Sequence, residues 1–300
     1  MRLSRLIQLF LTAVLANTAA GQEMEPRAYS PAPRGTQFVL LSYGHQSGDV
    51  LLDSSLPLKD VSISLNAATF GYGRTFNFAG RQANVAVLVP YIWGTAQGTV
   101  FEDQINVRRS GGGDMRVRFS TLFKGGEPLA PKEFAQRKPS TIIGASVSIV
   151  IPTGQYDPAR LVNPGSNRWA FKPEIGISRP NGRWTFEGMG GAWLFTTNKS
   201  FLGSSRREQK PMASFQGAVI YTLRRRMWVS VNATFYSGGS TVLNDTANED
   251  RQRNARVGAT FSYPLNQQQS FKVVWAKGVT TRIGGNLNTI VFAWQYAWFK

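Results

Sequence analysis

The last stretch of the chain, residues 288–299, places a large apolar side chain at every second position. A period of two belongs to a β-strand and not to a helix. One face of this strand would carry Ile290, Phe292, Trp294, Tyr296 and Trp298. Such a face needs an apolar surface to lie against, which is either the core of a soluble β-sandwich or the lipid around a membrane-spanning β-barrel. The rest of the sequence has to decide between these two folds.

The N-terminus has the layout of a secretory signal peptide. Arg2 and Arg5 precede an apolar run from Leu6 to Ala16, and small residues follow at positions 18–20. The alternative, a membrane anchor, needs roughly 20 apolar residues to cross a bilayer, and this run is shorter. We therefore predict that residues 1–20 form a signal peptide. The sequence has no cysteine, which excludes disulfides and cysteine-based metal sites.

Residues 21–36 are predicted to form a proline-rich N-terminal arm without regular structure, because they contain Pro26, Pro31 and Pro33. Prolines keep such an arm from pairing as a strand. The arm would emerge at the periplasmic mouth of a barrel, so we expect it to plug the lumen in part.

Strand-like segments recur after the arm at intervals of about 23 residues, which suits membrane strands of roughly 9 to 11 residues and their connections. No later apolar run is long enough for a membrane-spanning helix, so an exported chain of this kind can enter a membrane only as strands. We predict about 12 strands, because bacterial single-chain barrels have an even number. The predicted strands are residues 37–45, 64–78, 83–94, 114–124, 141–152, 169–178, 183–196, 212–223, 227–237, 253–263, 270–281 and 287–298.

The connections between these strands alternate in length. Tight turns are predicted at residues 79–82, 180–182, 224–226 and 265–269. Longer polar loops are predicted at residues 46–60, 95–113, 153–168, 198–210 and 238–252. Outer-membrane barrels have short periplasmic turns and long external loops. The connection at residues 123–140 is an exception, because it is long although it should be a periplasmic turn, and we expect a helical turn within it at residues 131–136.

The predicted fold for residues 37–300 is therefore all-β, an antiparallel up-and-down transmembrane β-barrel in the bacterial outer membrane. A soluble sandwich shows the same alternation but leaves the signal peptide, the strand spacing and the loop lengths unconnected.

The predicted inner face carries charged residues. On strand 114–124, Met115, Val117 and Phe119 share one face, so Arg116 and Arg118 are expected to point into the lumen. The predicted lumen-lining residues are Asp114, Arg116, Arg118, Lys172, Glu174, Glu187 and Arg256. Charges inside a membrane usually pair, so Asp114, Glu174 and Glu187 could neutralise the two arginines and brace the wall. If positive charge remains in excess, the lumen would favour anions such as aromatic carboxylates.

One stretch resembles a known family. Residues 154–174 read GQYDPARLVNPGSNRWAFKPE, and Arg183-Trp184, Arg282-Ile283-Gly284-Gly285 and Trp294-Gln295-Tyr296 follow. This pattern is similar to the transporter family named after the MetA (meta-cleavage) pathway of phenol degradation. The resemblance implies an outer-membrane barrel that admits hydrophobic or aromatic nutrients. Tyr156 and Asp157, in the long loop within this pattern, are candidates for the channel mouth.

The C-terminal strand is also the expected contact for the barrel-assembly machinery. Outer-membrane proteins usually end in an aromatic residue, whereas this chain ends in Lys300. The assembly signal would therefore be Trp298 or Phe299, slightly inset from the end.

The sequence offers few residues for catalysis or for binding a cofactor. His45 is the single histidine, and without a second histidine or a cysteine a zinc site is not expected. A lipid-modifying enzyme on a barrel would have to use His45, with Ser47 or a spatial neighbour as nucleophile. Gly111-Gly112-Gly113 lacks the Lys-Ser/Thr pair of a phosphate-binding loop. We therefore predict no catalytic residue, cofactor or metal.

The net charge of +17 raises the question of partners. The basic residues are scattered over turns, loops and lumen and form no single stripe, so no nucleic-acid partner is predicted. Lipid and lipopolysaccharide are the expected surroundings, and Arg206, Arg207, Arg251 and Arg253 either meet lipopolysaccharide phosphates or are simply solvated.

The predicted function is passive uptake of small aromatic or hydrophobic solutes, and the alternatives are a barrel-borne lipid-modifying enzyme or a purely structural protein. Twelve strands leave open whether the lumen is filled or conducts.

Overall fold

The computed structural model describes residues 25–51, 58–100, 103–160 and 162–299. The predicted signal peptide therefore lies outside the described residues. The strands of the main wall are β1 (Thr36–Leu51), β2 (Leu58–Phe78), β3 (Arg81–Val100), β5 (Met115–Lys124), β6 (Ile142–Ile151), β7 (Ala170–Asn181), β8 (Trp184–Phe195), β11 (Met212–Arg224), β12 (Met227–Gly238), β15 (Gln252–Pro264), β16 (Gln269–Thr281) and β17 (Gly284–Phe299).

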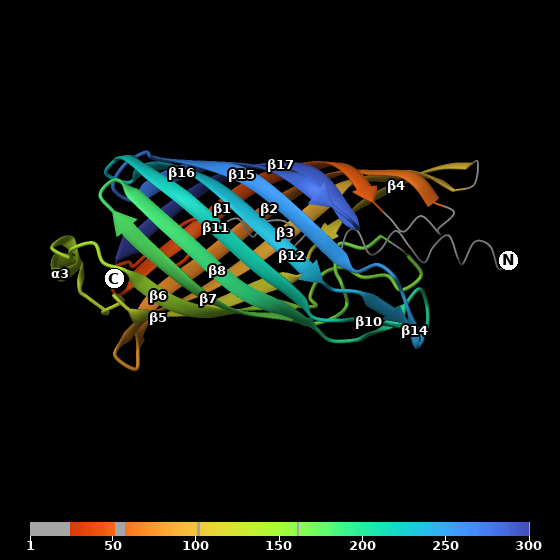
Figure 1. Cartoon of the computed structure of the whole chain (residues 1–300), viewed down its shortest axis with the longest axis horizontal. Coiled ribbons are helices and arrows are strands. Elements are labelled where there is room, and N and C mark those ends of the chain that lie inside the picture. Colours follow the sequence, from red (N-terminus) through yellow and green to blue (C-terminus); the bar gives the residue numbers. More distant parts are fainter. Residues whose placement is uncertain (1–24, 52–57, 101–102, 161, 300) are drawn as a thin grey trace.

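These strands form a closed antiparallel barrel (Figure 1). Within the described residues they belong to one 13-stranded sheet, in which β2 pairs with both β1 and β3 and so closes the ring. The thirteenth strand, β4 (Asp103–Gly112), pairs with the outer half of β3 and extends beyond the ring. The predicted all-β transmembrane barrel of about 12 strands is confirmed. No helix in the described part of the chain is long and apolar enough to cross a bilayer.

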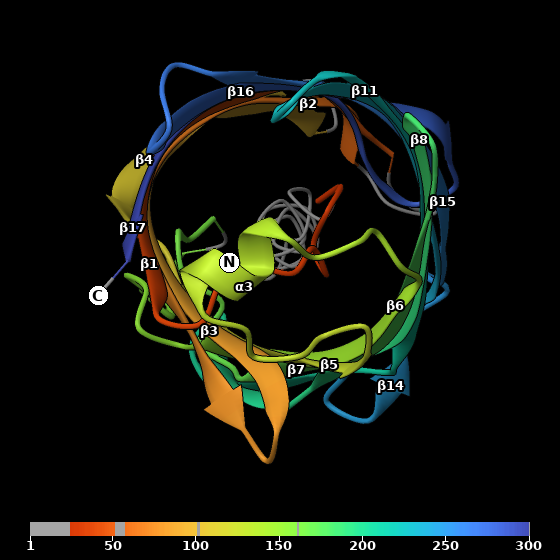
Figure 2. The same cartoon turned by 90° about the vertical axis from the view of Figure 1, so that its left-hand side faces the viewer.

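The two ends of the barrel differ as the connection lengths predicted. Tight turns at residues 79–80, 182–183 and 225–226 lie at the end that also holds the C-terminal end of β17. By the rule for outer-membrane barrels this end is periplasmic. The predicted helical turn is present as α3 (Pro131–Ala135). Figures 1 and 2 place α3 beyond the periplasmic opening.

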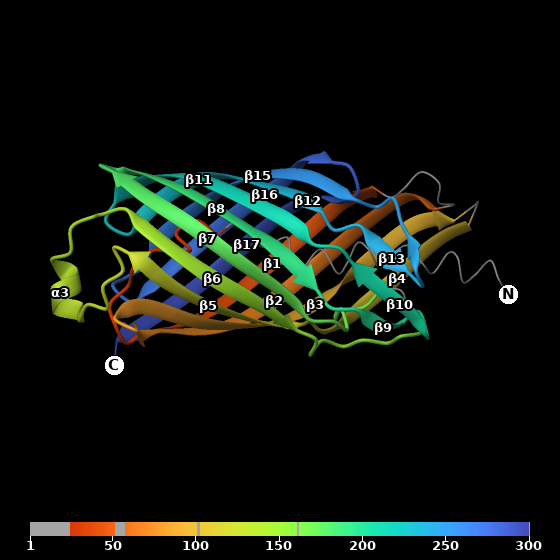
Figure 3. The ribbon, with the colours of Figure 1, turned by 60° about the horizontal axis from the view of Figure 1, so that its bottom comes forward.

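Three of the predicted external loops are wrong in detail, because they contain strands. Residues 103–112 are β4, and a second, four-stranded sheet is built from β9 (Asn198–Phe201), β10 (Ser205–Gln209), β13 (Thr241–Leu243) and β14 (Thr246–Ala247) (Figure 3). Strand β10 reads Ser-Arg-Arg-Glu-Gln, and its two buried residues are Arg207 and Gln209. Because the buried positions are polar, the sequence shows no apolar alternation there.

The side chains follow an inside-out pattern. On β12, Ser230 is 4% exposed, whereas the next residue, Val231, is 67% exposed. The same order holds where the sequence left the phase of residues 67–74 open, since Phe70 and Tyr72 face outward and Thr69 is buried. Large apolar groups outside and polar groups inside are expected of a wall that faces lipid. A soluble sandwich would have the reverse arrangement.

Closure rests on the pairing of β17 with β1, which runs from Thr36 opposite Phe299 to Leu51 opposite Gly284. Deleting residues 288–300 would leave two unpaired strand edges in lipid, where each unsatisfied backbone group costs several kcal/mol. We expect the truncated protein to give no heat-modifiable band in outer-membrane fractions on gel electrophoresis. A truncated protein that still assembled would contradict the barrel interpretation.

Candidate functional site in the barrel lumen

The described part of the N-terminal arm, residues 25–35, lies inside the barrel. Figure 2 looks through the periplasmic end, and the red segment within the ring is this arm. Tyr29 is its anchor, since its side chain is 3% exposed and packs against Leu122, Ile142 and Met189. The Tyr29 hydroxyl lies 3.0 Å from Ser146 Oγ and donates to Glu174 Oε1 at 3.2 Å.

Two glycines make room for the Tyr29 ring. Gly144 on β6 and Gly176 on β7 face each other in the strand register. A Cβ atom at either position would overlap the ring of Tyr29. The close approach of the arm to the wall therefore requires glycine at both positions.

Glu174 is the centre of the charged network in the lumen. Its Oε2 forms an ion pair with Lys172 Nζ at 2.6 Å, and its Oε1 lies 3.6 Å from Arg118 Nη2. Arg118 also lies 3.7 Å from the Glu25 carboxylate of the arm and donates to Ser146 Oγ at 3.2 Å. The guanidinium of Arg118 thus contacts both the wall, at Glu174 and Ser146, and the arm, at Glu25.

The other acidic candidates have different partners from those the sequence suggested. Glu187 accepts hydrogen bonds from the Arg27 backbone N–H at 2.7 Å and from Ser178 Oγ at 2.9 Å, so it holds the arm. Asp114 accepts from the backbone N–H groups of Gly154 and Ser166, at 2.9 and 2.8 Å. Asp114 therefore fixes the base of an external loop.

The remaining basic candidates line or brace the wall. The guanidinium of Arg116 lies 5.7 Å from the ring centre of Trp193, and Lys172 Nζ lies 5.9 Å from the same ring. Arg256 donates to Thr289 Oγ1 at 2.9 Å and so links β15 to β17 across the inner face. The roles of these residues in solute passage stay predictions.

The mouth-loop candidates lie between β6 and β7, in a loop that contacts the second sheet, which consists of β9, β10, β13 and β14. Tyr156 donates to the Ser200 carbonyl at 3.1 Å and accepts from Asn198, and its burial raises the pKa of its phenol. Asp157 pairs with Arg160 at 2.8 Å. Tyr156 therefore ties this loop to β9, whereas Asp157 braces the loop internally.

Two arginines are buried beside this loop. Arg168 donates to Gln209 Oε1 at 2.5 Å, and burial lowers the pKa of its guanidinium to about 9. Arg207 is only 8% exposed and lies over the ring of Phe201 at 5.3 Å. Both alternatives predicted for Arg207, a contact with lipopolysaccharide and simple solvation, are therefore wrong, because the residue is buried and its guanidinium packs over Phe201.

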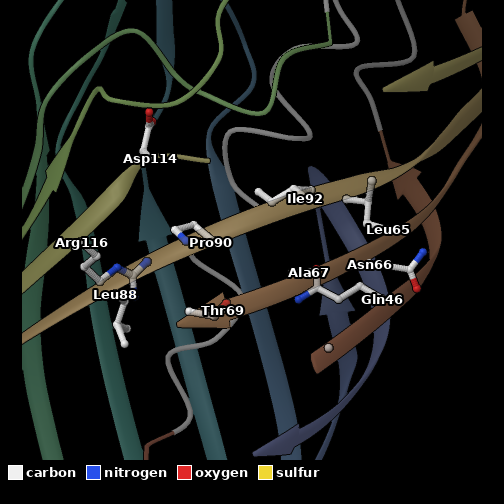
Figure 4. A pocket seen from close by; sticks show the side chains of 11 residues that line it. Gln46, Leu65, Asn66, Ala67, Thr69, Leu88, Pro90, Ile92, Asp114 and Arg116 are labelled. Carbon is white, nitrogen blue, oxygen red and sulfur yellow. The ribbon is translucent and has the colours of Figure 1, made fainter. Parts of the chain in front are cut away.

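A cavity of about 330 Å³ occupies the middle of the lumen. Among the described residues, its charged lining consists of Arg27, Arg116, Arg118, Lys172, Lys272, Glu25 and Glu174. A smaller pocket of about 70 Å³ lies nearer the external end (Figure 4). The two cavities share Leu88 and Arg116, which face each other on β3 and β5. Basic groups thus outnumber acidic ones along a connected lining.

The sequence analysis expected the arm in the lumen but named none of its contact residues, and it did not name Lys272. Tyr29 is the single aromatic residue in a proline-rich segment that otherwise resembles a linker, and this was the available signal. Its partners are more than a hundred positions away, Ser146 at a separation of 117 residues and Glu174 at 145. Nothing local in the sequence indicates such contacts.

The histidine is not part of the lumen. His45 Nδ1 lies 3.0 Å from Asn66 Oδ1, which also accepts from the Tyr43 hydroxyl at 2.7 Å. No group of three metal-ligating side chains occurs among the residues that the structure describes.

A closed barrel with an apolar outer wall and a polar interior defines an outer-membrane β-barrel. A model of the family described as the putative MetA-pathway of phenol degradation matches residues 42–292, and the chain belongs to this family. The family prediction from residues 154–174 is therefore confirmed.

Similar solved structures share the fold at low sequence identity. The COG4313 outer membrane channel from Pseudomonas putida F1 is 18% identical with a TM-score of 0.76, over 92% of this chain and 100% of that one. The transport unit of the autotransporter AIDA-I from Escherichia coli is 10% identical with a TM-score of 0.52, over 100% and 97%. A mutant of the TodX monoaromatic hydrocarbon channel is 10% identical with a TM-score of 0.50, over 90% and 91%. No curated protein sequence matches this chain.

Releasing the arm should open the lumen. Tyr29→Ala removes the buried ring, at a cost to arm docking of about 3 kcal/mol, and Gly176→Val denies the ring its space. We expect both variants to raise single-channel conductance in planar bilayers several-fold. Tyr29→Phe keeps the ring and serves as the control, with conductance close to wild type. Equal conductance in all four proteins would show that the arm does not limit passage.

Proposed function

We propose that the protein is a passive outer-membrane channel for small aromatic or hydrophobic solutes, with a preference for those that carry a carboxylate. The observation that carries this proposal is the connected lining of the two cavities. The outer pocket combines mostly apolar walls with the guanidinium of Arg116 and the carboxylate of Asp114, which backbone N–H groups of the external loop engage. It leads to a central cavity in which basic groups outnumber acidic ones.

The outer pocket suits an amphipathic solute. Leu65, Leu88, Pro90 and Ile92 supply apolar surface, and Arg116 projects beside Leu88 (Figure 4). Small-molecule sites commonly pair a mostly apolar wall with a few polar groups that fix orientation. An aromatic ring would lie against the apolar residues while a carboxylate faces Arg116.

The central cavity favours anions by its charge. Glu174 is engaged by two basic groups at once, Lys172 and Arg118, so one carboxylate serves two cations. Rings of Arg or Lys select anions in other pores. The similarity to a channel named for monoaromatic hydrocarbons agrees with an aromatic cargo.

The barrel sits in the lipid membrane, and we extend this to particular partners. Arg251 and Arg253 are exposed at the external end, where they can meet lipopolysaccharide phosphates. The barrel-assembly machinery would recognise β17, the strand that closes the ring. We propose no enzymatic activity, since the side chain of His45 is held by Asn66 and lines neither cavity.

Charge reversal in the lumen tests the selectivity. Under a salt gradient in a planar bilayer, we expect Arg116→Glu with Arg118→Glu to shift the reversal potential toward cation selectivity. The matched control is Arg251→Glu with Arg253→Glu, which changes the net charge equally at the external rim. An identical reversal potential in a properly folded lumen variant would remove these arginines from the pathway.

Uptake in cells tests the cargo. A deletion strain carrying the wild-type protein should take up aromatic carboxylates faster than the strain without it, and faster than size-matched polar neutral solutes. The Arg116→Glu and Arg118→Glu variant should lose this advantage by about tenfold, as expected for the loss of one charge-assisted contact. No difference between the deletion strain and the complemented strain would refute the channel proposal.

A further inference from the structure

Five arginines lie on two neighbouring periplasmic turns and on the ends of the strands that lead into them. They are Arg179, Arg183, Arg224, Arg225 and Arg226, and all five are exposed. The turns are adjacent because Thr222 N donates to the Arg183 carbonyl at 2.8 Å, across the pairing of β8 with β11. In the described part of the chain, no carboxylate forms an ion pair with any of the five.

An apolar groove of about 590 Å³ lies on the outer wall next to these turns. The strand register places Trp184, Tyr221, Val229, Phe261 and Val273 in one row across five strands. The next row contains Val219, Val231, Ala259 and Trp275. The small side chains of Val231 and Ala259 lie in the second row next to Trp275, and the first row beside them contains three aromatic side chains. This difference in size produces the hollow.

The basic cluster and the groove meet at the aromatic belt. The guanidinium of Arg224 lies over the ring of Tyr263 at 5.5 Å, and Tyr263 follows Phe261 on the same outward face. Arg183 precedes Trp184, whose ring centre lies 4.7 Å from that of Tyr221. Aromatic residues of this kind mark the boundary between hydrocarbon and head groups.

We propose that this face binds one anionic phospholipid of the periplasmic leaflet, with its phosphate on Arg183, Arg224 and Arg225 and an acyl chain in the groove. Guanidinium groups bind phosphate oxygens through paired, charge-assisted hydrogen bonds. Apart from Ser230, Thr260 and the Tyr221 hydroxyl, the groove is lined by apolar groups, which suits a hydrocarbon chain. The charge and the hollow therefore match the two ends of one molecule.

Two other occupants fit less well. Lipopolysaccharide carries its phosphates in the opposite leaflet, whereas this cluster lies at the periplasmic end. A second copy of the chain, related by a two-fold axis along the membrane normal, would bring two arginine clusters to the same level. Like charges at close range repel.

The test is lipid retention by the full-length protein in native mass spectrometry after purification in mild detergent. The probes are dioleoyl phosphatidylglycerol, dioleoyl phosphatidylethanolamine and lipid A. We expect the wild-type protein to retain one phosphatidylglycerol in preference to the other two. The variant Arg183→Gln, Arg224→Gln, Arg225→Gln should bind it on the order of 100-fold more weakly, from the typical contribution of a basic residue near an anionic surface.

Two further variants separate the groove from bulk charge. Lys124→Gln with Lys132→Gln and Lys138→Gln removes the same charge from the β5–β6 connection at the same end, and it should bind like wild type. Ala259→Trp fills the groove and should weaken retention about tenfold while the heat-modifiable barrel band persists. Arg226 is left in place, because it donates to the carbonyls of Asn266 and Gln267 and so holds the next turn.

Three results would overturn the proposal. They are equal retention of phosphatidylglycerol and phosphatidylethanolamine, preferred retention of lipid A, and a protein dimer that carries no lipid. Weakening by the lysine variant as large as that by the arginine variant would reduce the effect to net charge and would also count against the site.

Discussion

The whole structure depends on the requirement that every backbone N–H and C=O in lipid be paired within the protein. A sheet meets this requirement only if it closes, and here the closing contact is the long pairing of β1 with β17. Closure fixes the faces of every strand, because alternate side chains must then point to lipid or to the lumen. The same constraint explains why polar residues such as Ser230 and Asn232 are buried while valines are exposed.

A ring of this size encloses more space than its wall side chains fill, and the arm occupies part of the remainder. The arm brings its own carboxylate and guanidinium, Glu25 and Arg27, into a lumen that already holds charges. Intramembrane charges are costly unless they pair. Glu174 and Glu187 meet this need in different ways, since one neutralises wall cations and the other accepts from the arm backbone.

The sequence predicted the features that follow from period-two alternation. It missed those that depend on contacts between residues far apart in the chain. The strand number, the tight turns and the outward face of residues such as Val231 follow from alternation and turn residues. Strand β10 was not predicted, because its buried residues, Arg207 and Gln209, are polar. The pairing of the charges was not predicted either, because one partner of Glu187 is a backbone N–H of the arm, which no side-chain pattern reveals.

The contacts that hold the arm differ greatly in strength. The Arg118–Glu25 pair spans 3.7 Å and its glutamate side chain is 53% exposed, and such an exposed pair contributes up to about 1 kcal/mol. Tyr29 loses a buried ring if it leaves, which is worth about 3 kcal/mol, together with its contacts to Ser146 and Glu174. The ring therefore dominates, and the ion pair can open without releasing the arm. Under the proposed function, Arg118 would therefore exchange Glu25 for the carboxylate of a solute while Tyr29 stays packed against Gly144 and Gly176.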